Sequence, residues 1–83
     1  MLHVRAKERM QSGELPTRGP CRCYAGTGSS LICALCDAPI LVSEIEYELE
    51  FARPDASGAK VVRFHPECES IWNEERLRLG HDP

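Results

Sequence analysis

Two short pairs of cysteine and histidine residues constrain the fold of this chain more than any other feature. Cys33 and Cys36 form a C-x-x-C pair, and after 28 intervening residues His65 and Cys68 form an H-x-x-C pair. A C-x-x-C turn can point both sulfur atoms at one centre, and positions i and i+3 of a helix share a face. Three thiolates and one imidazole make up a closed tetrahedral set of the kind that structural zinc prefers. The sequence therefore predicts one structural Zn²⁺ ion bound by all four residues.

The small size of the chain favours stabilisation by a bound metal ion. Its 83 residues allow one small domain with a limited core, and domains of this size often need an added constraint. The five cysteines are an odd number, which a complete set of intrachain disulfides cannot use. Neither a secretory signal nor an apolar run of membrane-spanning length is present, so we expect a cytoplasmic protein that does not bind membranes. Structural disulfides are rare in the cytoplasm, so metal binding is the favoured role of the cysteines.

Two other interpretations of the four residues remain open. The cysteines could be buried as small hydrophobic side chains, with His65 on the surface. Cys33 and Cys36 could instead form a redox pair. No βαβ pattern accompanies that pair, and a redox pair would leave His65 and Cys68 unexplained.

The remaining cysteines and histidines are expected to lie outside the site. Cys21 and Cys23 occur in a stretch rich in glycine and proline, at a spacing that is less common for zinc. We expect them to be spare thiols, although they could replace a ligand or bind a second ion weakly. His3 and His81 lie near the ends of the sequence and are expected to be solvated.

The first thirty residues predict a short helix followed by a loop. Residues 4–12 are good helix formers, and Gly13 suits the C-terminal end of a helix. Residues 13–30 hold four glycines and two prolines, which is typical of a loop or linker. We therefore expect residues 1–30 to form an N-terminal arm and residues 31–83 to form the zinc-binding domain.

Residues 43–51, "SEIEYELEF", alternate strictly between apolar and acidic side chains. This period of two predicts a β-strand with one buried face and one solvated face. The expected buried face carries Ile45, Tyr47, Leu49 and Phe51. The expected solvated face carries Glu44, Glu46, Glu48 and Glu50, and the basic residues of the arm that could balance its charge are Arg5, Lys7 and Arg9.

The C-terminal half predicts a hairpin and then a helix. Residues 53–60, "RPDASGAK", are typical of a hairpin connection, and residues 60–65 form the expected return strand. Pro66 suits the first position of a helix that runs to Leu79 and ends at Gly80, with Trp72 as its core anchor. The predicted fold is α+β: a small treble-clef-like domain with a zinc knuckle, a β-hairpin and a C-terminal helix.

The distribution of charge and the motifs in the sequence restrict the classes of function that we expect. Residues 1–30 carry a net charge of +3 and residues 31–83 carry −6, so the body of the chain disfavours binding to nucleic acid or anionic membranes. No H-E-x-x-H, phosphate-binding loop or Ser-His-Asp set is present, and four strong ligands leave no open metal position. We therefore expect a non-enzymatic zinc-binding module that mediates protein interaction.

Two alternatives use residues of the N-terminal arm. One is a nucleic-acid-binding zinc finger, in which the phosphate contacts would come from Arg5, Lys7, Arg9, Arg18 and Arg22. The other is a thiol-redox or metal-handling protein that uses Cys21 and Cys23.

The ligand pattern also resembles known zinc fingers. Its spacing is similar to that of the poly(ADP-ribose) polymerase type, which binds DNA breaks, and its ligand types are those of the first LIM finger. The DNA-binding surface of the former family is basic, whereas the matching strand here reads "EIEYELE".

A resemblance over the whole length is to small uncharacterised bacterial proteins with a zinc-finger-like layout. They share segments like "SGELP", "CALCDAPI", "EYELEF" and "FHPEC". The matching positions are Gly13, Leu15, Pro16, Cys33, Cys36, Ile40, Glu46, Glu48, His65, Cys68 and Trp72. This resemblance implies a zinc-finger-like fold and no particular activity.

Overall fold

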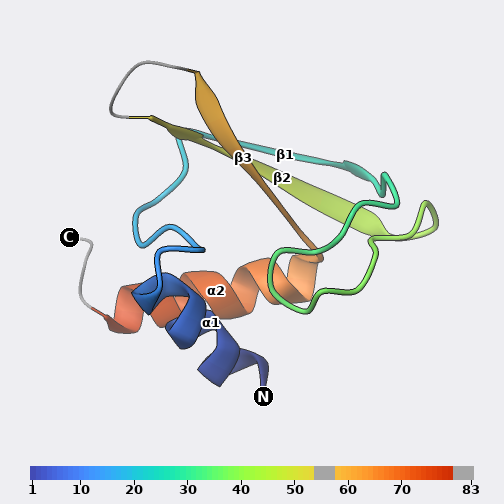
Figure 1. The fold of residues 1–83 in the computed structure, drawn as a ribbon. Helices are drawn as coiled ribbons and strands as arrows, with labels where there is room; N and C mark the ends of the chain where they lie inside the picture. The colour runs from blue at the N-terminus through green and yellow to red at the C-terminus, as the bar shows by residue number, and fades with distance from the viewer. Residues whose placement is uncertain (54–57, 80–83) are drawn as a thin grey trace.

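The computed structural model describes residues 1–53 and 58–79, which form two helices and a three-stranded antiparallel sheet (Figure 1). In chain order the elements are α1 (Leu2–Gln11), β1 (Arg22–Thr27), β2 (Ile45–Ala52), β3 (Ala59–Phe64) and α2 (Pro66–Arg78). The strand order is β1-β2-β3, α2 packs on β2 and β3, and α1 packs on α2. Both helices therefore lie on one side of the sheet, and the predicted α+β class is confirmed.

The core lies between the sheet and α2 and is centred on Trp72. The Trp72 ring is fully buried and stacks on Phe64 at 5.5 Å between ring centroids, while Phe51 meets it edge-on at 5.9 Å. The indole Nε1–H donates to the carbonyl oxygen of Pro16 at 2.8 Å, so its polar atom is satisfied inside the core. The predicted role of Trp72 as core anchor is confirmed.

The N-terminal segment contributes to this same core. Helix α1 begins two residues earlier than predicted, and Gly13 follows it with a φ of +86°, a conformation that glycine adopts without strain. Ala6 and Met10 of α1 and Leu15 after it are buried in the core cluster. Residues 1–30 thus supply apolar side chains to the interior.

Strand β1 corrects the expectation of a continuous loop over residues 13–30. Its residues pair antiparallel with β2, from Arg22 opposite Glu50 to Thr27 opposite Ile45. All six side chains of β1 are exposed, so no apolar alternation marks the strand in the sequence. The backbone N–H and C=O groups of β1 pair with those along the edge of β2. The strand therefore depends on a contact between segments distant in sequence.

The burial pattern of β2 differs from the strict alternation at its first residues. Leu49 and Phe51 are fully buried as predicted, but Ile45 is half exposed and Glu46 is only 6% exposed. The Glu46 carboxylate accepts hydrogen bonds from the amide (3.1 Å) and the hydroxyl (2.6 Å) of Ser29. The loop before β2 therefore covers a carboxylate that we expected to be solvated.

Arg63 of β3 balances the acidic strand in place of the arm residues. Its guanidinium lies 3.4 Å from the Glu46 carboxylate and 3.9 Å from that of Glu48. Cross-strand pairs of this kind are neighbours across the sheet, whereas α1 packs on α2. Arg5 and Arg9, which we expected could balance this face, instead donate hydrogen bonds to residues 34–37.

Helix α2 begins at Pro66 as predicted, and the buried residues on it are Cys68, Trp72, Glu75 and Arg76. Two acidic residues lie in its first turn and two basic residues in its last turn, which suits the helix dipole. The predicted end at Gly80 and most of the predicted hairpin connection, residues 54–57, lie outside the described residues.

Gly28 allows a close approach of two chain segments just after β1. A Cβ atom at this position would lie 2.0 Å from the carbonyl oxygen of Leu41 and 2.5 Å from that of Ile40. The Gly28 amide also donates to the carbonyl of Glu44 at 2.9 Å. Backbone atoms cannot move aside as a flexible side chain can, so only glycine fits here.

We expect Gly28→Ala to lower the free energy of unfolding by about 1–3 kcal/mol, the range for overpacking. Gly26→Ala is the matched control, because a Cβ there meets nothing within 4 Å. Denaturant midpoints of the two variants measure the difference. Equal midpoints would show that the contact between residues 28 and 41 is loose.

Candidate metal centre

The C-x-x-C turn is held by backbone hydrogen bonds at both of its ends. The amide of Asp37 donates to the carbonyl of Cys33 at 3.1 Å, and the amide of Cys33 donates to that of Ala38 at 2.9 Å. The amide of Ala34 donates to the carbonyl of Arg63 at 2.8 Å. This last bond docks the turn on the end of β3, two residues before His65.

The four predicted ligand residues converge on one point. The Sγ atoms of Cys33, Cys36 and Cys68 and a ring nitrogen of His65 all lie within 4.8 Å of one another. Cys33 and Cys68 are buried, whereas Cys36 and His65 are partly buried. The two pairs of residues, separated in sequence, thus form a single group that could hold a metal ion.

The spacing of these atoms suits a tetrahedral ion. The Cys36 Sγ lies 3.4 Å from the Nδ1 of His65. Bonds of about 2.3 Å to sulfur and about 2.0 Å to nitrogen put two such ligand atoms about 3.5 Å apart around a tetrahedral centre. Small inward shifts of the other sulfur atoms would complete the same geometry.

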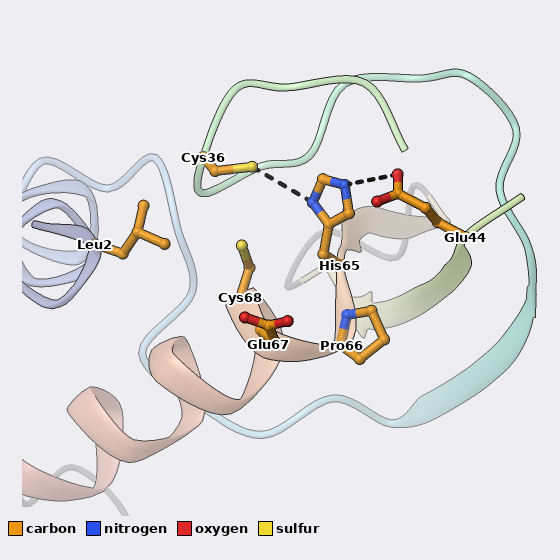
Figure 2. A pocket seen from close by; sticks show the side chains of 7 residues that line it. All are labelled: Leu2, Cys36, Glu44, His65, Pro66, Glu67 and Cys68. Carbon is orange, nitrogen blue, oxygen red and sulfur yellow. Dashed lines mark hydrogen bonds and ion pairs between the residues drawn. The ribbon is translucent and has the colours of Figure 1, made fainter. Parts of the chain in front are cut away.

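Glu44 orients the imidazole of His65 from the outside. Figure 2 shows the ring between Cys36 and Glu44, with its Nε2 3.3 Å from the Glu44 Oε1. The amide of Leu41 donates to that carboxylate at 2.8 Å and holds it in place. A carboxylate on Nε2 leaves Nδ1 free as a metal ligand, which is the usual support for a metal-bound histidine. Sequence reasoning assigned Glu44 to a solvated strand face and missed this role, because nothing in the residue spacing relates it to His65.

The thiols of the cluster perturb one another's ionisation. Burial raises the pKa of Cys33, but backbone amides including that of Leu35, 3.5 Å from the sulfur, outweigh burial and lower it to about 7. Burial raises the pKa of Cys68, and the nearby sulfur atoms of Cys33 and Cys36 raise it further. Three thiols this close cannot all ionise together unless a cation joins them, which favours a metal ion at their centre.

Arginine side chains from α1 donate hydrogen bonds to the knuckle, which is the C-x-x-C turn of residues 33–38. Arg9 donates to the carbonyl of Ala34 at 2.7 Å and makes two hydrogen bonds of 2.9 and 2.7 Å to the carboxylate of Asp37. Arg5 donates to the carbonyl of Leu35 at 3.2 Å. Asp37 has a φ of +66°, an unusual conformation for a residue other than glycine, and the hydrogen bond from Arg9 lowers the pKa of its carboxyl. These hydrogen bonds therefore hold the residue that immediately follows Cys36.

A pocket opens beside the cluster and gives it a route to solvent (Figure 2). Its walls combine three of the cluster residues with apolar and acidic neighbours: Leu2, Cys36, Glu44, His65, Pro66, Glu67 and Cys68. Leu2 comes from α1, so the N-terminal helix forms one side of this opening.

Cys21 and Cys23 lie outside the cluster. Both are exposed on or next to β1, and the Sγ of Cys21 lies 3.2 Å from the carbonyl oxygen of Glu50. Burial and the charge of Glu69 raise the pKa of Cys23, which opposes a reactive thiolate. These positions do not support replacement of a cluster ligand.

Four basic residues of the arm have contacts within the chain. Besides Arg5 and Arg9, Arg18 donates to the carbonyl of Ala52, and Arg22 lies 3.3 Å from the hydroxyl of Tyr24. His3 is exposed, as expected, and its Nδ1 also lies 2.7 Å from the Glu75 carboxylate. His81 lies outside the described residues.

Comparison of the chain with protein-family models, curated protein sequences and solved structures gave no match. The resemblances described from the sequence therefore stay predictions. Within residues 1–53 and 58–79, neither helix has the length and apolar character needed to cross a membrane.

We expect Arg9→Met to lower the free energy of unfolding by about 1 kcal/mol or more, because it removes charge-assisted hydrogen bonds to the knuckle. Arg78→Met is the matched control, since Arg78 is exposed and makes a single i,i+4 ion pair, which contributes little. Thermal melts of the metal-loaded proteins measure both effects. Equal melting temperatures would mean that α1 does not stabilise the knuckle.

Proposed function

We propose that the chain is a non-enzymatic zinc-binding module in which Cys33, Cys36, His65 and Cys68 bind one structural Zn²⁺ ion. The observation that carries the proposal is the convergence of the four ligand atoms within 4.8 Å. The element order of C-x-x-C turn, β2–β3 hairpin and α2 supports a treble-clef-like arrangement, with one ligand pair on the turn and the other at the start of the helix.

Zinc is the metal that suits this ligand chemistry best. Thiolates and imidazole select zinc over the hard cations magnesium and calcium, which prefer oxygen ligands. Three thiolates and a neutral imidazole around Zn²⁺ leave a net charge of −1. The backbone amides near Cys33 are placed to offset that charge, as the low pKa of its thiol indicates.

The ligand set supports a structural role rather than a catalytic one. A catalytic zinc ion keeps one position open for water or substrate, whereas four side chains here would fill the tetrahedron. The ion would join the knuckle to α2 across the core of a small domain. Its binding free energy would then contribute to folding.

Exposed apolar side chains near the knuckle support an interaction with protein. Five of them lie within residues 31–45 and are 47–69% exposed: Leu31, Ile32, Leu41, Val42 and Ile45. The amide of Ile40 donates to the carbonyl of Leu31 at 2.9 Å, and Ile32 bridges to Pro39, so the two ends of this segment lie together. The metal ion would hold the segment that carries this apolar surface, and apolar surface of this kind is typical of protein-binding sites.

We expect the purified, reduced protein to contain one Zn²⁺ per chain by elemental analysis. Removal of the ion by a chelator, or Cys36→Ser, should unfold the domain because the free energy of metal binding would be part of the free energy of folding. Circular dichroism measures the loss, and Cys21→Ser is the matched control outside the cluster. A metal-free protein with unchanged spectrum and melting temperature would contradict the structural role of the ion.

We expect Glu44→Gln to weaken zinc binding about 10–100-fold, because the amide cannot supply the negative charge that supports the metal-bound imidazole. Competition against a chromophoric chelator measures the affinity. Glu50→Gln is the matched control at a glutamate of β2, the strand that follows Glu44. An equal affinity of both variants and the unsubstituted protein would remove Glu44 from the metal site.

We expect the double variant Ile32→Ser, Val42→Ser to keep zinc and fold while losing a protein partner captured by the unsubstituted chain. Crosslinking followed by mass spectrometry measures the loss, and the double variant Glu48→Gln, Glu50→Gln is the control.

We expect no binding to duplex DNA or RNA at physiological salt, because the zinc-binding half of the chain is acidic. Micromolar binding that weakens steeply with salt would favour the nucleic-acid alternative instead.

A further inference from the structure

A second cluster of potential ligands lies between the two helices. His3 of α1 and Glu74 and Glu75 of α2 each offer one ligand atom, and these three atoms lie within 4.8 Å of one another. The Nδ1 of His3 is 2.7 Å from the Glu75 Oε2 and 3.6 Å from the Glu74 Oε1. The cluster shares no residue with the cysteine site.

The carboxylate of Glu75 is the unusual member of this cluster. Glu75 is only 2% exposed, and its Oε1 is a buried oxygen without a hydrogen-bond partner among residues 1–53 and 58–79. The hydrogen bond from His3, with the charges of Arg78 and Lys7, lowers the pKa of Glu75, so the carboxylate is ionised at neutral pH. A buried carboxylate with one unsatisfied oxygen is costly, and a bound cation would offset that cost.

We propose that His3, Glu74 and Glu75 form a second metal site, which binds a divalent ion of the zinc type across the interface between α1 and α2. One imidazole and two carboxylates suit zinc or cobalt better than magnesium or calcium, because the imidazole is a borderline ligand. The Nδ1 that now contacts Glu75 would turn its lone pair to the ion. Water would fill the remaining positions, since the side chains of His3 and Glu74 are 51% and 53% exposed.

The second site binds its ion more weakly than the cysteine cluster. Arg78 lies 3.6 Å from the Glu74 Oε2, and Lys7 is close enough to act on Glu75, so two positive charges compete with the ion. The site contains no thiolate and is open to water on one side. An ion bound there would tie α1 to α2 and would add stability only when free metal is present in excess.

Titration of the reduced full chain with Co²⁺, after removal of bound metal, tests the proposal. We expect two equivalents by calorimetry. The first should bring thiolate-to-cobalt charge-transfer absorption, and the second should bind without adding to it. His3→Ala and Glu74→Gln should each lose the second equivalent and keep the first with its full absorption. Glu8→Gln, a change at an exposed acidic residue of α1, should keep both.

Three results would overturn the proposal. The first is a single equivalent in the unsubstituted chain, which would make the cluster a plain ion pair. The second is a second equivalent that persists in Glu74→Gln, a half-exposed position where substitution leaves the core untouched. The third is a second equivalent that adds thiolate absorption and disappears in Cys21→Ser. Failure of the cysteine site would appear separately, as missing charge-transfer absorption at the first equivalent.

Discussion

Three thiols and an imidazole are crowded together at the junction of β3 and α2, and the knuckle and α1 are arranged around them. Cys33 and Cys68 are buried there, and their sulfur atoms perturb one another's ionisation. Such a group is unfavourable as three thiolates alone and strongly favourable around a cation. A small core built on Trp72 then closes over one side of the junction, with the knuckle docked on the end of β3 through Ala34.

The N-terminal thirty residues complete this arrangement from outside. Helix α1 places Arg9 on the knuckle and Leu2 beside the opening of the cluster, while β1 satisfies the edge of β2. The cysteine cluster, the knuckle and α1 are therefore coupled through direct contacts. A change at the cluster would be felt at α1, and the orientation of α1 would in turn affect how the knuckle presents Cys33 and Cys36.

Local patterns predicted the parts of the chain in which spacing alone brings residues together. The two ligand pairs follow from their spacing, the buried Leu49 and Phe51 from a period of two, and the start of α2 from the preference of proline for the first helical position. Strand β1 escaped prediction because its exposed side chains carry no pattern. The burial of Glu46 under Ser29 escaped because it depends on a loop that folds over the strand from elsewhere in the sequence.

Short segments of the sequence were enough to predict the four residues of the cysteine cluster and the α+β class, since ligand chemistry and residue periodicity are local properties. The long-range partners of these segments follow from the packing of the elements: Glu44 contacts His65, Arg9 contacts Asp37, and Glu75 contacts His3. Charged side chains have several possible partners along a chain of this length. The partner each one meets depends on how the helices and the sheet pack, because packing alone brings positions distant in sequence within hydrogen-bonding distance.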